Sequence, residues 1–111
     1  MKKYIPTTKE NHFLKVELYY TKGGINVFTY KTEARGYYLS VSPIERTRTD
    51  YGATLESYTA FSGVKKCVLE VSRKSQKQEA RAEQLAADLE PVLIRHVLAS
   101  SGLELAEGVQ V

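Results

Sequence analysis

The chain has little of what metal centres and disulfide frameworks require. Its 111 residues include one cysteine, two histidines and no tryptophan. The lone thiol of Cys67 cannot form a disulfide within the chain. His12 and His96 lie far from Cys67 in sequence, unlike the closely spaced ligands of a zinc site. We therefore predict no metal ligands and no cofactor.

Long apolar runs are also missing. The longest apolar stretches span only a few residues, and the segment Met1–Pro6 lacks the apolar core of a signal peptide. We therefore expect a cytoplasmic protein with no membrane partner. Apolar residues make up 42% and charged residues 26% of the chain, as in ordinary globular proteins. The length suits one domain with one hydrophobic core.

The formal net charge is +3, and the charged residues are distributed unevenly along the chain. The local balance is +3 over residues 1–61, +4 over residues 62–81 and −4 over residues 82–111. A basic middle section beside an acidic tail favours a nucleic-acid surface. An ordinary solvated surface with the same balance is the alternative.

The first half of the chain alternates apolar and polar residues with the period of a β-strand. Alternation over residues 12–20, 25–31, 37–42 and 53–61 predicts four strands. Gly23-Gly24 predicts a hairpin turn, and residues 32–36 predict a second turn that ends in a glycine. Pro43 lacks a backbone N–H and should end pairing, which leaves residues 44–52 as an exposed connection. The result is an antiparallel meander, with residues 13–43 forming its first three strands.

The second half has helical spacing. Val64, Cys67, Val68 and Val71 recur at the interval of one helix face, although a fifth strand over 67–71 is an alternative. Ser75 and Gln78 match a capping box, and an apolar stripe continues from there to about residue 100. Pro91 should kink or restart that helix.

These patterns predict an α+β fold, in which a four-stranded antiparallel meander is followed by one or two C-terminal helices packed on one face. Within a single domain, we expect an N-terminal arm over 1–11, the sheet over 12–61, a helical region over 62–102 and a tail over 103–111. Leu85, Leu89, Leu93 and Val97 should pack against the sheet.

The sheet face turned away from the helices is predicted to be aromatic. Alternation places Phe13, Tyr19, Phe28, Tyr30 and Tyr38 on that face. Exposed aromatic rings edged by cations bind single strands, because bases stack on the rings while cations hold phosphates. Tyrosine is also favoured in strands for packing alone, so another element or a partner subunit covering this face is the alternative.

Two groups of cations accompany the rings. We predict that one group surrounds the aromatic face, and it consists of Lys22, Lys31, Arg35, Arg46 and Arg48. The second lies in the helical region and includes Lys65, Lys66, Arg73 and Lys74. The prediction is a non-enzymatic protein that binds single-stranded DNA or RNA with weak sequence preference. The alternative is a protein-interaction or structural module whose aromatic face is buried in a homodimer or partner interface, and a homo-oligomer is expected in either case.

Enzymatic signals are weak. Ser62 and Lys65 have the spacing of a serine-lysine pair but lack the accompanying motifs. His96 lies on the apolar stripe, which is typical of a packed histidine, and Cys67 is expected on an inward helix face as a small hydrophobic residue. We predict no catalytic residue.

Two segments, Lys22–Phe28 and Arg35–Pro43, resemble small uncharacterised proteins carried by bacterial conjugative elements, over roughly residues 13–75. This resemblance implies a mobile element as the source and no particular activity. Separately, the order of four antiparallel strands followed by helix is similar to the PC4 and Whirly-type single-stranded-DNA-binding folds, whose subunits pair through their helices. That likeness is one of layout, and the long connection over 44–52 departs from it.

Overall fold

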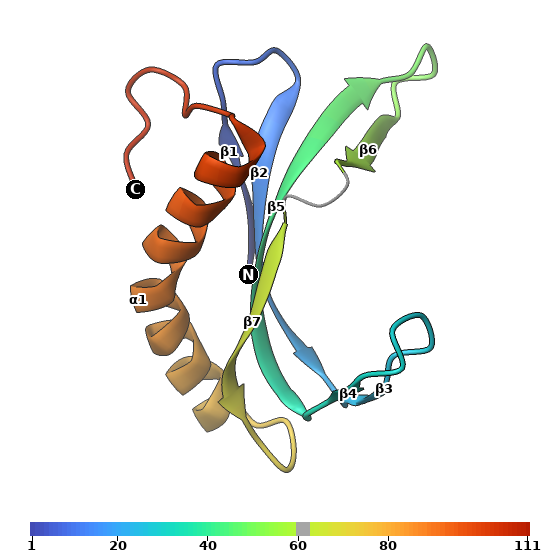
Figure 1. The fold of residues 1–111 in the computed structure, drawn as a ribbon, viewed down its shortest axis with the longest axis vertical. Coiled ribbons are helices and arrows are strands. Elements are labelled where there is room, and N and C mark those ends of the chain that lie inside the picture. Colours follow the sequence, from blue (N-terminus) through green and yellow to red (C-terminus); the bar gives the residue numbers. More distant parts are fainter. Residues whose placement is uncertain (60–62) are drawn as a thin grey trace.

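The fold, seen in a computed structural model that describes residues 1–59 and 63–111, is α+β (Figure 1). A curved antiparallel sheet carries one long helix on one face. The elements in chain order are β1 (Lys2–Pro6), β2 (His12–Thr21), β3 (Gly24–Ile25), β4 (Thr32–Glu33), β5 (Gly36–Arg48), β6 (Thr54–Tyr58), β7 (Val64–Glu70) and α1 (Gln76–Ser101). The predicted fold class is therefore correct, but the sheet has more strands than the predicted four.

The centre of the sheet is the ladder between β2 and β5, which runs from the pair His12–Glu45 to the pair Thr21–Gly36. The predicted meander placed a strand over residues 25–31 beside β2, and this was wrong. Those residues instead belong to a separate two-stranded hairpin, β3–β4, that leaves the sheet between β2 and β5. The reason is local: the Asn26 side chain accepts hydrogen bonds from the backbone of Phe28 and Thr29 and closes the chain into a loop.

Strand β5 is longer than predicted because Pro43 does not end it. One edge of β5 pairs with β2, while the other edge is shared by β7 as far as Val41 and by β6 from Ile44 onward. Pro43 lies between these two partners, at a position where the strand ladder does not need a backbone N–H. Its carbonyl oxygen accepts a hydrogen bond from the Thr59 backbone at 3.3 Å. The predicted connection over 44–52 is thus mostly the end of β5, and the predicted fourth strand over 53–61 contains β6, with residues 60–61 outside the described part.

The helix predicted from Val64 was also wrong, since β7 occupies this segment. Tyr38 pairs with Cys67 whereas Tyr37 pairs with Leu69, so a β-bulge adds one residue at Val68. The extra residue shifts the alternation of apolar residues by one, which imitates helical spacing. Cys67 is therefore exposed on a strand and is not packed on a helix.

Helix α1 begins as predicted, because the Gln78 backbone donates to the Ser75 side chain at 3.2 Å. It passes through Pro91 without a second start. Packing on both sides of the proline offsets the lost hydrogen bond, since Ala82 and Ala86 are buried before it and Ile94 and Val97 after it.

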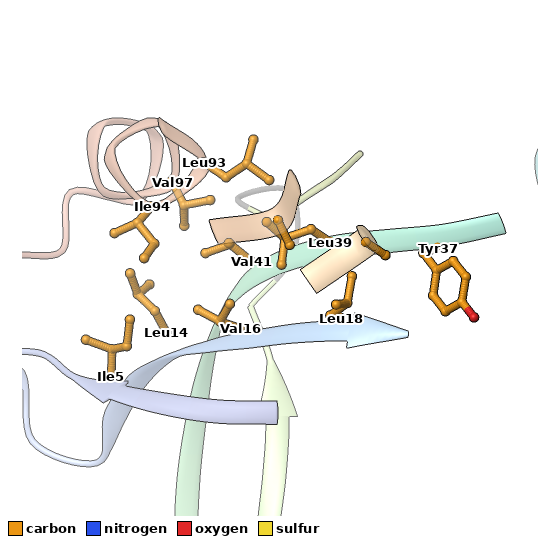
Figure 2. Packing of buried hydrophobic residues seen from close by; sticks show 12 residues of the cluster. Ile5, Leu14, Val16, Leu18, Tyr37, Leu39, Val41, Leu93, Ile94 and Val97 are labelled. Carbon is orange, nitrogen blue, oxygen red and sulfur yellow. The ribbon is translucent and has the colours of Figure 1, made fainter. Parts of the chain in front are cut away.

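The core lies between α1 and the sheet (Figure 2). Leu93, Ile94 and Val97 point from the helix toward side chains of β2 and β5. The sheet side of the core is lined by Ile5, Leu14, Val16, Leu18, Tyr37, Leu39 and Val41. Of the predicted helix leucines, Leu93 is buried and Leu89 is partly buried, but Leu85 is 38% exposed.

The C-terminal tail covers one edge of this core. Its Ala106 backbone donates to the Pro6 carbonyl at 3.1 Å, and Leu105 forms an isolated bridge with Thr7 at the end of β1. Leu103, Leu105 and Val109 pack against the core cluster. The tail thereby closes the β1 side of the molecule. Among the described helices, none is long and apolar enough to cross a membrane.

Candidate nucleic-acid interface

The face of the sheet turned away from α1, here called the open face, has no helix over it in the described part of the chain (Figure 1). Two hairpins, β3–β4 and β5–β6, project from its two ends on the side opposite the helix. The ladder between β2 and β5 places Tyr19 opposite Tyr38 on this face, as alternation predicted. Their rings stack with centroids 6.0 Å apart. Tyr38 itself is only 6% exposed, so its ring faces are already in contact with other side chains.

Lys65 covers the Tyr38 ring. Its ammonium lies 5.4 Å from the ring centroid and forms an ion pair with Glu33 of β4. The hydrogen bond to Glu33 raises the pKa of Lys65, and burial raises the pKa of Tyr19 and of Tyr38. The Tyr38 hydroxyl donates to the Ala34 carbonyl at 2.7 Å. These contacts join the open face to the base of the β3–β4 hairpin.

A second set of contacts on the open face centres on Glu56 of β6. The Tyr4 hydroxyl donates to this carboxylate, and Lys15 donates to it at 3.1 Å and to the Tyr58 hydroxyl at 2.7 Å. Arg46 adds an ion pair at 3.7 Å. We call this set, Tyr4, Lys15, Arg46, Glu56 and Tyr58, the Glu56 network. Hydrogen bonds from Tyr4 and Lys15 lower the pKa of Glu56, while the bond to Tyr58 and the contact with Glu56 raise that of Lys15.

Arg46 is held between aromatic rings. Its guanidinium carbon lies 4.1 Å from the Tyr4 ring centroid and 5.9 Å from that of Phe13. Its Nε is buried and has no hydrogen-bond partner within the described residues. Arg46 also lines a shallow hollow of about 310 Å³ together with Arg48 and Asn11. This hollow lies at the β5–β6 end of the open face.

The loop of the β3–β4 hairpin presents the most exposed aromatic pair. Phe28 is 90% exposed and Tyr30 is 85% exposed. The loop is nevertheless ordered by its own hydrogen bonds, because Asn26 donates to the Lys31 carbonyl at 2.9 Å and accepts from Tyr30 at 2.8 Å. Tyr30 has a positive φ of 56°, which this turn imposes. We call residues 26–31 the hairpin loop.

Arg35 fastens the base of this hairpin to the turn between β7 and α1. Its guanidinium donates to the Lys22 carbonyl at 3.3 Å and to the Ser72 carbonyl at 2.8 Å. The Arg35 carbonyl in turn accepts from Val71 at 3.1 Å. This junction gathers cations from three segments at one end of the molecule. We call the cations of these segments the basic end: Lys22, Lys31, Arg35, Arg73 and Lys74, of which Lys74 lies 5.8 Å from the ring centroid of Tyr20 on the helix side of the sheet.

The predicted site residues therefore fall into separate groups. Phe28 and Tyr30 project beside the basic end, whereas the alternation had placed them on the sheet face with Tyr19 and Tyr38. Arg46 and Arg48 lie at the opposite end of β5. On β7, Lys65 turns toward the open face, whereas Lys66 lines a hollow against α1. The predicted basic cluster of Lys65, Lys66, Arg73 and Lys74 is thus divided between β7 and the following turn.

Sequence reasoning missed the Glu56 network and one exposed ring. Tyr4 was assigned to an N-terminal arm, but it forms part of β1 opposite Lys15. Tyr51, at the tip of the β5–β6 hairpin, is 97% exposed. The alternation of Glu56 and Tyr58 in the predicted fourth strand was the available signal for two of the five residues of the network.

Comparison with protein-family models, with curated proteins and with solved structures found no match to this chain. Among residues 1–59 and 63–111, no group of three or more His, Cys, Asp or Glu side chains could hold a metal ion. Ser62, half of the serine-lysine spacing, lies outside the described residues. His96 is exposed on α1.

Proposed function

We propose that the protein binds single-stranded nucleic acid without catalysing a reaction, and that it does so through the hairpin loop and the basic end. The observation that carries the proposal is that two almost fully exposed rings, Phe28 and Tyr30, lie on a hairpin whose base Arg35 joins to two other segments that carry cations. Every base has a π-face, so stacking on these rings tolerates any sequence. The cations supply phosphate contacts that position the backbone.

Charge favours the basic end over the open face as the phosphate-binding surface. On the open face, Lys15 and Arg46 share Glu56, and Lys65 is paired with Glu33. At the basic end, by contrast, Lys31 and Arg73 form no ion pair within the described residues. A phosphate meeting these two side chains displaces only solvent and counterions.

The hairpin loop is also prepared for stacking. Its hydrogen bonds through Asn26 hold the backbone before any ligand arrives, so little conformational entropy is lost on binding. Arg35 anchors the hairpin to the β7–α1 turn and so fixes the rings relative to the cations. A single strand can then place bases on the loop while its backbone follows the basic end.

The test is titration of a fluorescein-labelled oligothymidylate against the wild type and two double variants, at about 50 and 200 mM salt. Replacing Phe28 and Tyr30 with alanine should weaken binding by about tenfold or more, because each stacked base contributes roughly 1–3 kcal/mol, and should leave the salt dependence unchanged. Replacing Lys31 and Arg73 with glutamine should instead flatten the salt dependence.

Tyr51→Ala is the matched control, since it removes an equally exposed tyrosine from the other hairpin. It should bind like the wild type. Absence of binding at micromolar protein in low salt would refute the proposal. If Tyr51→Ala lost as much affinity as the loop variant, exposed rings would act without the basic end, and the assignment of binding to that end would be wrong.

A second candidate function is an interaction module whose open face is buried against another copy. The favouring observation is that this face is aromatic and compensated in charge, with Tyr58 61% exposed and Tyr19 half-buried. Sedimentation equilibrium would reveal such a dimer, and Tyr58→Arg should weaken it. A monomer at all concentrations would exclude this candidate.

A further inference from the structure

The two flanks of α1 are covered differently. On the β1 side, the C-terminal tail lies against the helix and the sheet, and Val109 packs against the core. On the β7 side, no segment in the described part of the chain continues the sheet, because β7 pairs only with β5. The outer edge of β7 therefore presents unpaired backbone groups, a feature that proteins usually cover or protect.

Apolar residues of the helix are exposed on this open flank. Val92 is 50% exposed and Leu85, two helical turns earlier on the same flank, is 38% exposed. Val92 and His96 line a hollow of about 300 Å³ whose other wall is Val64 and Lys66 of β7. Val92 and Leu85 therefore leave apolar surface on this flank, next to the outer edge of β7.

Charge indicates what kind of strand fits. A second hollow, near the start of α1, is lined by Leu69 and by Lys77 and Arg81. Together the two hollows are lined by three cations and no carboxylate, and none of these cations forms an ion pair within the described residues. A second copy offering its own β7 would bring another Lys66 toward the same cations. An acidic strand would complement the charge of these cations, whereas the Lys66 of a second copy would be repelled by them.

We propose that the outer edge of β7 binds an extended acidic segment of a partner protein by strand addition. The segment pairs with the β7 backbone, its apolar residues contact Val92 and Leu85, and its carboxylates meet Lys66, Lys77 and Arg81. Main-chain pairing supplies affinity, and the alternation of acidic and apolar side chains supplies specificity. This surface is separate from the hairpin loop, and the proposal does not depend on nucleic-acid binding.

The probe for this proposal is a fluorescent seven-residue peptide of alternating valine and glutamate, compared with a valine-lysine peptide of the same length. Only the acidic peptide should bind, and it should slow amide hydrogen exchange across Val64–Glu70, a signature of strand addition that surface attraction alone does not produce. Val92→Glu and Lys66→Glu should each weaken binding at least tenfold. Val92 is 50% exposed and Lys66 is also exposed, so the fold should tolerate both substitutions.

Ala87→Glu is the matched control, because Ala87 is exposed on the opposite flank of α1 beside the tail. It should leave peptide binding unchanged, and all three variants should bind the oligonucleotide like the wild type. The proposal is overturned if the basic peptide binds equally well, if β7 exchange is unaffected, or if a peptide-free dimer already protects β7. Competition between the oligonucleotide and the peptide at β7 would assign this edge to nucleic acid instead.

Discussion

At the scale of single residues, the most informative group is Glu56, where two cations, Lys15 and Arg46, and the Tyr4 phenol converge on one carboxylate. The Tyr4 and Lys15 hydrogen bonds stabilise its charged form and lower its pKa. A lowered carboxyl pKa stabilises the fold above the ordinary carboxyl range, and this contribution is lost as pH falls through the lowered pKa. The raised pKa of Lys15 acts at the other extreme, because its contribution is lost only as alkaline pH passes that raised pKa.

We therefore expect Glu56→Gln to lower the melting temperature by a few degrees at neutral pH, since Lys15 and Arg46 lose their carboxylate. The difference between variant and wild type should shrink as pH falls below about 4.5, where the unfolded chain binds the proton first, and should vanish once pH has passed the lowered pKa of the folded carboxylate. Thermal unfolding monitored by circular dichroism from pH 7 to pH 3 measures this. Glu10→Gln, an exposed position without an ion pair in the described residues, is the control. A difference independent of pH would contradict the assignment.

A second prediction at this scale concerns Gly36, whose role differs from the expected one. The sequence predicted it as the glycine that ends a turn over residues 32–36, but Gly36 lies in β5, and a Cβ there would come within 2.2 Å of the Leu69 carbonyl oxygen. Gly36→Ala should therefore cost about 1–3 kcal/mol by forcing β5 and β7 apart. Gly52→Ala is the comparison, because its φ is +80° and a Cβ meets nothing within 4 Å. Its cost should be about 1–2 kcal/mol from the backbone alone, without weakening β7 protection in hydrogen exchange.

Single residues also show how far alternation can be trusted. It placed Tyr19 and Tyr38 on the face away from the helix, because β2 and β5 are regular strands. It failed for Phe28 and Tyr30, because a period of two does not distinguish a strand of the sheet from a hairpin loop closed by Asn26. The sequence thus identified Phe28 and Tyr30 as candidate stacking residues but assigned them to the wrong part of the fold.

At the scale of elements, α1 was predictable because its signals are local. Ser75 caps it, Gln78 completes the hydrogen bond and the apolar stripe has helical period. Strand β7 was predicted only as the alternative to a helix, over residues 67–71, because the bulge at Val68 depends on pairing with a strand thirty residues away. The extension of β5 through Pro43 likewise depends on which partner occupies the outer edge. Both failures come from non-local pairing.

The same helix offers a matched pair of leucines for testing the packing. Leu93 is 4% exposed in the core, whereas Leu85 is 38% exposed on the β7 flank. Leu93→Ala should cost about 2–5 kcal/mol, the usual range for a buried leucine. Leu85→Ala should cost clearly less, because much of its surface is already in water. Urea unfolding of both variants would measure the costs, and equal values would mean that the assigned core face is wrong.

At the scale of the whole molecule, the β3–β4 hairpin is an addition to a fold that is complete without it. The β2–β5 ladder continues to the pair Thr21–Gly36, and none of the core residues lies in the hairpin. Gly23 already lies close to Ala34 and Arg35, since a Cβ on it would be within 2.9 Å of both. The chain can therefore be rejoined at this point with little change in β2 or β5.

We accordingly expect a variant lacking residues 24–33 to fold with nearly wild-type stability and to lose nucleic-acid binding. Shortening a connection changes loop entropy only slightly, and the ion pair between Glu33 and Lys65 is partly exposed and worth no more than about 1 kcal/mol. The variant should therefore keep its melting temperature within a few degrees while the oligothymidylate titration shows no saturation. Peptide binding at β7 should persist, because that edge lies outside the deletion. A variant that unfolds would show that the hairpin supports the fold, and one that binds oligonucleotide normally would move the interface to the open face, where Arg46 and Arg48 would then be the cations to replace.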